Sequence, residues 1–188
     1  MPPDFAAQRQ IMVDSQVRPN DVPTLAIQKA MRSVPREAFC PPDKAYLAYA
    51  DAEVEYAPGR FMMRPRDVAK LIYATRPAAG ERALAIAAPY AAAVLEAMGL
   101  SVIRCDPDSA PAGAFDVIVC EGAVSTAPPP AWIDALAPGG RLGVVVRDGR
   151  VGRAWLFQRT HDGVGSRAVF DAGPPVMRGF EAKAGFVF

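Results

Sequence analysis

The residue best suited to ligand chemistry is Asp106, which directly follows the apolar run Ser101–Cys105. In nucleotide-binding sheets, a carboxylate about 20 residues beyond the end of the first strand accepts hydrogen bonds from ribose hydroxyls. Asp106 lies 19 residues beyond Ala87, where the preceding apolar run ends. The spacing therefore fits a ribose ligand. An Asp before a proline is also a common start of a turn, so both interpretations stay open.

Other groups that carry chemistry are sparse. Cys40, Cys105 and Cys120 are far apart in the sequence, and the last two lie in apolar runs typical of buried strands. We interpret them as buried thiols without a redox or metal role. The single histidine, His161, has no second histidine or close cysteine pair in the sequence. We therefore expect no metal site and no histidine-activated nucleophile.

Composition narrows the class of partner. The 21 Lys and Arg residues against 20 Asp and Glu give a net charge of +1, so no large field attracts nucleic acid or an anionic membrane. The absence of an apolar leader or a long apolar run predicts a cytoplasmic protein. With 188 residues, 51% of them apolar, we expect one domain, with helices and a connector over 1–80 and a sheet core over 81–188.

The elements that must position these residues fall into two groups. Apolar residues at helical spacing predict helices over Phe5–Val17, Val22–Met31 and Arg66–Thr75, with Asp21 as the cap of the second. Between them, prolines interrupt Val34–Pro65, which predicts a packed connector.

From Arg82 onward, short apolar runs alternate with helical segments, a pattern that predicts a parallel sheet. A hairpin across His161–Gly163 should add antiparallel strands at the edge, and Pro174–Phe188 is expected to be an irregular ending. The runs with strand character are Ala83–Ala87, Ser101–Cys105, Phe115–Cys120, Arg141–Val146, Ala154–Arg159 and Arg167–Phe170, and those with helix character are Pro89–Met98 and Pro130–Leu136.

Short motifs follow one another along the chain: MVDSQVRPNDV (12–22), VPREAF (34–39), AYAD (48–51), GR (59–60), FDVIVCEGAV (115–124), LAPGGRL (136–142) and GFVF (185–188). In this order they resemble the bacterial branch of the protein-L-isoaspartate O-methyltransferase family. The resemblance implies a Rossmann-like sheet that binds S-adenosylmethionine and methylates isoaspartyl carboxylates in damaged proteins. Such chemistry depends mostly on positioning and charge complementarity.

The cofactor loop departs from the family pattern. Relatives carry a D-x-G-x-G-x-G loop, whose glycines let the backbone approach the cofactor. The corresponding segment here, Leu84–Tyr90, contains no glycine, and Ala85 replaces the acidic residue. Pro89 also removes one N–H at the turn.

The sheet should also be shorter than in relatives. In the family, a helix and a third strand follow the position of Asp106, but only Pro107–Ala114 separate it from the FDVI strand. Eight residues cannot hold a helix and a strand. We expect the sheet to lack one strand–helix unit, which in relatives covers one side of the adenine.

The substrate side is altered as well. Relatives have I-S-Q-P before the third helix, with the serine near the reacting carboxylate, whereas this chain has Met62–Pro65, which places Met63 at the serine position. Arg64 could pair with a carboxylate, or stay solvated beside Arg60 and Arg66. This basic cluster could also meet an acidic partner or a phosphate.

Two hypotheses of different class follow. The first is a degenerate family member with no expected cofactor, which works as a binding or scaffold protein with another protein as its partner. The second is an active S-adenosylmethionine-dependent methyltransferase with a rebuilt pocket formed by Tyr90, Asp106, Glu121 and Gly122. Glu121 and Gly122 could equally be retained for packing at the strand exit. The emptied crevice could also take another small ligand, and the sequence does not fix the oligomeric state.

Overall fold

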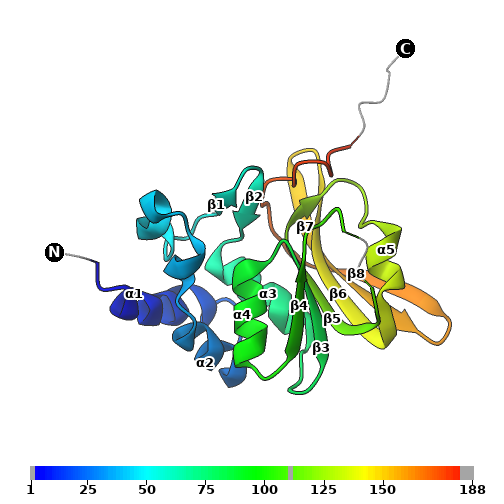
Figure 1. Cartoon of the computed structure of the whole chain (residues 1–188), viewed down its shortest axis with the longest axis horizontal. Coiled ribbons are helices and arrows are strands. Elements are labelled where there is room, and N and C mark those ends of the chain that lie inside the picture. Colours follow the sequence, from blue (N-terminus) through cyan, green and yellow to red (C-terminus); the bar gives the residue numbers. More distant parts are fainter. Residues whose placement is uncertain (1–2, 110–111, 183–188) are drawn as a thin grey trace, which may run out of the picture.

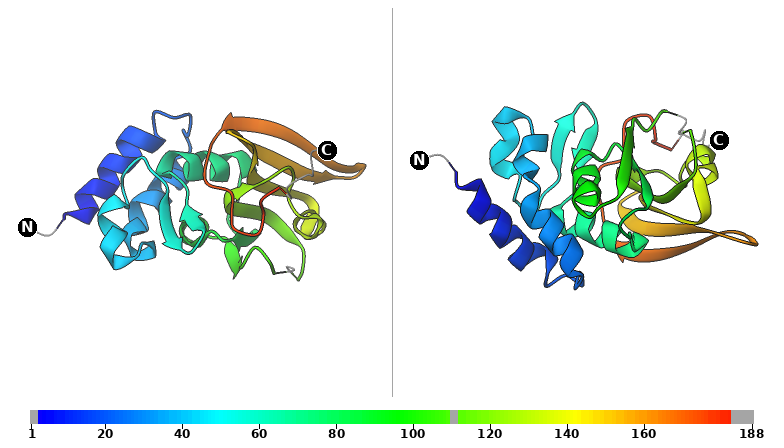
Figure 2. Two further views of the ribbon diagram at one scale, coloured as in Figure 1. Left: turned by 90° about the horizontal axis from the view of Figure 1, so that it is seen from above. Right: turned by 60° about the horizontal axis from the view of Figure 1, so that its bottom comes forward.

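The computed structural model describes residues 3–109 and 112–182. The GFVF motif (185–188) therefore lies outside the described residues. The helical N-terminal part packs beside one face of a mixed sheet (Figures 1 and 2). The helices are α1 (Phe5–Met12), extended by a π-helical turn (Val13–Val17), α2 (Leu25–Ser33), α3 (Pro65–Thr75), α4 (Pro89–Ala97) and α5 (Pro130–Asp134), with 3-10 turns at Arg36–Phe39 and Pro42–Leu47.

The main sheet has the strand order β4-β3-β5-β6-β7-β8. Strands β4, β3, β5 and β6 are parallel, and β7 and β8 add antiparallel pairs, as predicted. Its strands are β3 (Arg82–Ile86), β4 (Ser101–Cys105), β5 (Phe115–Val124), β6 (Leu136–Asp148), β7 (Val151–Thr160) and β8 (Gly163–Asp171). A separate hairpin of β1 (Val54–Ala57) and β2 (Arg60–Met62) lies within the predicted connector.

Alternation along the central strands divides the core into two layers. Ala83, Ala85, Val117 and Val119 join the core shared with the N-terminal helices, α3 and α4. Their neighbours in sequence point to the opposite face, which is covered by Trp132 of α5 and by Met177. This period of two is what a strand imposes. The central strands are therefore covered on both faces, as parallel sheets require.

The missing edge unit is confirmed within the described residues. Neither a helix nor a strand occurs between Cys105 and Phe115, apart from the two residues not described there. The chain leaves β4 and returns to the start of β5 on the other side of β3, with fewer than the dozen residues usual for a parallel crossover. Strand β4 is left at the end of the sheet.

One local prediction was wrong. Helix α2 begins after Thr24, three residues later than the position at which Asp21 would cap it. Asp21 instead adopts a left-handed backbone with φ of 62°, which Asp tolerates better than most residues. Its carboxylate lies 3.9 Å from Lys70 of α3.

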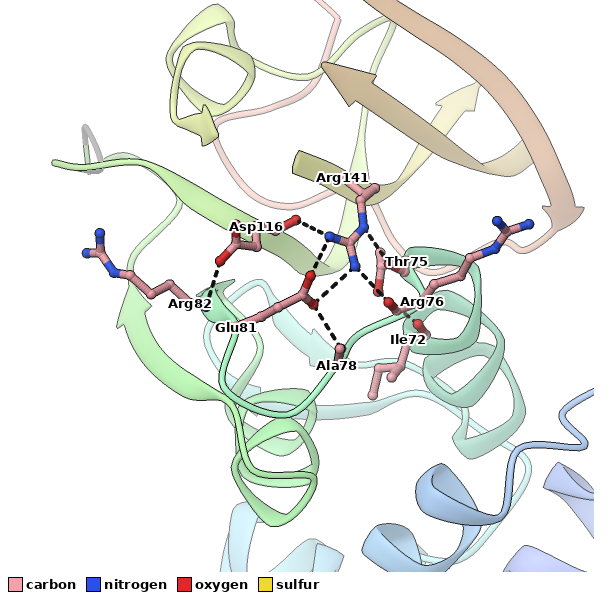
Figure 3. Close-up of polar contacts among 8 residues, drawn as sticks. All are labelled: Ile72, Thr75, Arg76, Ala78, Glu81, Arg82, Asp116 and Arg141. Atoms are coloured by element: carbon pink, nitrogen blue, oxygen red, sulfur yellow. Dashed lines mark hydrogen bonds and ion pairs between the residues drawn. The ribbon is translucent and has the colours of Figure 1, made fainter. Parts of the chain in front are cut away.

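Arg141, from the LAPGGRL motif, joins three elements at the amino end of the sheet (Figure 3). Its guanidinium donates to the carbonyls of Thr75 and Arg76 at the end of α3, and to the carbonyl of Asp116 on β5. It also binds both carboxylate oxygens of Glu81, at 2.8 and 3.1 Å. A cation at a helix C-terminus satisfies carbonyls that the helix leaves free. Arg141 therefore fixes α3 against the sheet.

The Glu81 carboxylate completes this junction by accepting the Ala78 N–H. Burial raises the pKa of Glu81, but the hydrogen bonds from Arg141 and Ala78 outweigh it and leave this pKa below its ordinary value. A lowered carboxyl pKa stabilises the fold above the unfolded-state pKa, and the contribution is lost as pH falls through the folded-state value. The junction is therefore a neutral-pH contribution to stability.

We expect Arg141→Lys to lower the free energy of unfolding by about 2–4 kcal/mol, because a lysine cannot serve the Glu81 fork and three carbonyls together. Urea denaturation at pH 7 measures the change. The matched control is Arg153→Lys, whose partner Asp171 is 83% exposed and which should shift stability by no more than about 0.5 kcal/mol. Equal effects of the two substitutions would contradict the role assigned to Arg141.

Candidate functional site

The crevice at the carboxyl ends of β3 and β4 is where an open α/β sheet is expected to bind a ligand. It has a volume of about 260 Å³ and is lined by Tyr56, Ala85, Ala87, Ala88, Pro89, Arg104, Cys105 and Asp106. Asp106 is exposed and directly follows β4, which is the position predicted from the sequence. Whether it holds a ribose stays a prediction.

The turn between β3 and α4 forms the floor of this crevice. Ala87 adopts a left-handed backbone with φ of 47°, a conformation that costs an L-residue with a Cβ roughly 1–2 kcal/mol. The Tyr56 hydroxyl donates to the Ala87 carbonyl at 3.0 Å. The turn thus has the left-handed backbone that glycine usually adopts, but Ala87 carries a methyl group there. The hydrogen bond from Tyr56, a residue of the connector, holds the turn in place.

Glu121 lies at the centre of a buried polar cluster, beside the crevice and closed from solvent. Its side chain is fully buried, and one carboxylate oxygen accepts the N–H of Ala91 at 2.6 Å while the other accepts the N–H of Met63 at 3.2 Å. Ala91 is the third residue of α4. The carboxylate of β5 therefore satisfies the first turn of α4, the place where a helix dipole favours an anion.

Arg36 supplies the opposite charge of the cluster. It belongs to the VPREAF motif and is fully buried. It donates to the Met63 carbonyl at 2.5 Å and to the Ala48 carbonyl at 2.8 Å. The backbone of Met63 is thus bound by Glu121 at its N–H and by Arg36 at its carbonyl. This role of Arg36 was not predicted from the sequence, although a charged residue within a family motif could have indicated a structural ion pair.

Tyr90 belongs to the same cluster and does not line the crevice. Its ring is fully buried beneath the Arg36 guanidinium, 4.7 Å from its centroid, in a cation–π arrangement. The hydroxyl has no hydrogen-bond partner among the described residues. Burial, the largest influence, raises the pKa of Tyr90. Tyr90 can contact a ligand only if the core opens.

The substrate-side residues are also engaged within the chain. Met63 is fully buried. Arg64 is paired with Glu53 at 3.0 Å, so the predicted alternative of a carboxylate partner is met internally. Arg60 faces Asp108 at 3.5 Å and Arg66 faces Asp67 at 3.0 Å. The basic cluster is therefore largely neutralised, which argues against a free phosphate or acidic-partner site there.

The segment after β8 covers the exit of β5 (Figures 1 and 2). The Met177 N–H donates to the Ala123 carbonyl, the Ala123 N–H donates to the Pro175 carbonyl, and Arg60 donates to the carbonyl of Arg178. A Cβ added at Gly122, which has φ of 152°, would lie 2.6 Å from the Met177 side chain. Gly122 is therefore a packing position beneath the chain's own C-terminal segment.

Among residues 3–109 and 112–182, no group of three or more metal-ligating side chains comes together. In the same part of the chain, no helix is both long and apolar enough to cross a membrane.

The strand order, the parallel centre, the antiparallel edge and the flanking helices define a Rossmann-like methyltransferase fold. A structure from Plasmodium falciparum, described as a protein-L-isoaspartate O-methyltransferase in complex with S-adenosyl-L-homocysteine, aligns with a TM-score of 0.74 at 14% identity and covers 90% of this chain and 98% of that one. A second protein-L-isoaspartate O-methyltransferase structure aligns with a TM-score of 0.65 at 18% identity, covering 92% and 65%.

Sequence relatives identify the family. The protein-L-isoaspartate O-methyltransferase of Methylorubrum extorquens is 32% identical over 94% of this chain and 91% of its own length. That of Methylorubrum populi is 32% identical over 94% and 98%. No family model matches the chain. The chain belongs to the protein-L-isoaspartate O-methyltransferase family, as its sequence motifs predicted.

Glu121→Gln should lower the free energy of unfolding by about 1–3 kcal/mol, because the amide must turn a donor toward the Met63 N–H or the Ala91 N–H. Burial, the largest influence, raises the pKa of Glu121, against the opposing effects of Arg36 and the two N–H donors. A raised carboxyl pKa stabilises the fold below the unfolded-state value, and this contribution is lost as pH rises. The advantage of the native protein over E121Q should therefore shrink as pH rises above 4.5, the ordinary pKa of a glutamate.

Urea denaturation of both proteins between acid and neutral pH measures this difference. Glu53→Gln is the control, because it removes a partly exposed carboxylate from the connector that Glu121 binds through Met63. Its cost should stay below about 1 kcal/mol. An advantage over E121Q that grew with pH would contradict the assigned direction of the pKa shift.

Proposed function

We propose that this chain is a degenerate member of its family, which does not bind S-adenosylmethionine in the usual manner and acts as a binding or scaffold protein. The observation that carries the proposal is the Glu121 carboxylate on the first turn of α4. That turn is a natural anion site. Here the chain's own side chain occupies it, fully buried and tied on both oxygens.

The remaining crevice supports the same proposal. Its volume of about 260 Å³ falls below the roughly 300–1,000 Å³ of typical small-molecule sites. The Cβ atoms of Ala87 and Ala88 replace the bare backbone of a glycine loop, and Pro89 offers no N–H. Among the four predicted cofactor residues, Asp106 alone lines this space. The residues present therefore fit S-adenosylmethionine poorly.

The second candidate is an active S-adenosylmethionine-dependent methyltransferase acting on isoaspartyl residues of damaged proteins. Its support is the exposed Asp106 at the ligand edge of the sheet, together with the activity in the names of the relatives. This alternative requires Met177 to leave Gly122 and Glu121 to release α4, so that the cofactor finds room. Both movements would break hydrogen bonds that the folded chain makes.

We further propose that the protein works in the cytoplasm and that its partner is another protein. The near-zero net charge supports neither a nucleic acid nor a membrane surface. The small crevice also makes an extended surface a better place for recognition than a cavity.

Calorimetric titration with S-adenosylmethionine and with S-adenosylhomocysteine tests the proposal, with the Methylorubrum extorquens relative as the positive control. We expect binding at least about a hundredfold weaker than that of the relative, because two or three charge-assisted hydrogen bonds are missing. Methyl transfer to an isoaspartyl peptide should be absent. A dissociation constant in the low micromolar range, or turnover that depends on Asp106, would establish the second candidate.

A further inference from the structure

The outer edge of β4 is an unpaired strand edge within the described part of the chain. Strand β4 ends the sheet and pairs with β3 alone. The Ser101 N–H donates to Glu81, and the Cys105 carbonyl accepts from Ala87, both on the β3 side. Backbone groups alternate in direction along a strand. The N–H and C=O groups of Val102 and Arg104 therefore point outward.

The same edge carries an exposed apolar side chain. Ile103 is 45% exposed. Its register partner Leu84 lies in the core layer that contains Trp132, so Ile103 extends that layer beyond its cover. The strand–helix unit that follows in relatives is absent here. An apolar residue and two pairs of backbone groups are left at the position from which the next strand would continue.

Three devices that commonly protect an edge strand, a free lysine, a proline and a bulge, are lacking at β4. Edge strands are usually protected by free lysines, prolines or bulges. The register between β3 and β4 is regular, and β4 contains no proline. The charge of Arg104 is directed toward α4, where its guanidinium binds both carboxylate oxygens of Glu96 at 2.5 and 2.7 Å. This pairing leaves the outward backbone groups of the strand accessible.

We propose that β4 pairs antiparallel with β4 of a second copy of this chain, about a twofold axis at Ile103. In this register Val102 faces Arg104 of the second copy, and Arg104 faces its Val102, so both outward pairs exchange hydrogen bonds. The two Ile103 side chains then meet as a close non-hydrogen-bonded pair. Shifting the register by two residues in one direction would place the two Arg104 side chains opposite each other, which like charges disfavour.

Self-complementarity is the reason to choose a second copy over a foreign peptide. A twofold interface requires one patch to fit itself, and in this register apolar meets apolar, while each arginine is already neutralised by Glu96. The strand is short, so we expect a weak dimer of the size class of transient complexes. The inference rests on the missing edge unit and is independent of the cofactor proposal.

Sedimentation equilibrium of the whole chain, from about 10 µM to 1 mM, tests the interface. We expect a monomer–dimer equilibrium that Ile103→Lys weakens at least tenfold, because two ammonium groups would face each other. Val151→Lys is the matched control, since Val151 is 62% exposed on β7 and should leave the equilibrium unchanged. Val102→Pro, which removes an outward N–H alone, should also favour the monomer.

Oxidative crosslinking fixes the register in the same experiment. In a background with Cys40→Ser and Cys105→Ser, I103C should form a disulfide-linked dimer, because Cα atoms about 4.5 Å apart suit that bond. V164C, on the opposite edge strand β8, should not. A chain that stays monomeric at all concentrations, or a dimer unaffected by I103K, would overturn the proposal. Preferential crosslinking of V164C would do the same.

Discussion

The interaction on which the rest of the structure depends is the pair of hydrogen bonds that Glu121 accepts. One joins β5 to α4 and the other joins β5 to the connector before α3. A fully buried carboxylate is costly unless its lone pairs are satisfied and an opposite charge is near. Arg36 meets the second requirement, because it binds the carbonyl of the same Met63 whose N–H Glu121 accepts. The N-terminal half of the chain is thereby attached to the sheet through a polar cluster inside an apolar core.

This cluster explains why several sites change together. Because Glu121 accepts the Ala91 N–H, that donor in the first turn of α4 is not available to a ligand. Tyr90 lies inward, where Arg36 covers its ring, and Met63 is buried with its N–H bound to Glu121 and its carbonyl bound to Arg36. The C-terminal segment closes the exit of β5 through Met177. Under the proposed function, these internal contacts take the place of cofactor contacts at this edge of the sheet.

The sequence predicted those features that depend on local pattern. Periodicity located the helices and the strands of the sheet, and the short interval after Asp106 predicted the missing unit. The function of Glu121 could not be found in this way, because its two donors lie 30 and 58 residues away. The start of α2 after Thr24 and the β1–β2 hairpin were not predicted for a related reason. In both places prolines and tertiary packing outweigh local propensity. Tyr90 was assigned to the crevice although neighbouring positions on a helix point to different sides.

The loss of an edge unit affects the sheet unevenly. Strand β5 is buried along almost its whole length, whereas every residue of β4 is exposed or only partly buried. The core is concentrated on β3, β5 and β6, so a unit beyond β4 can disappear without exposing it. The consequences fall on the outer strand, through Ile103 and the outward backbone groups. They also fall on the crevice, because the family resemblance implies that the missing unit formed one of its walls. The two proposals therefore share one origin, because the same missing unit leaves the crevice less enclosed and the edge of β4 open.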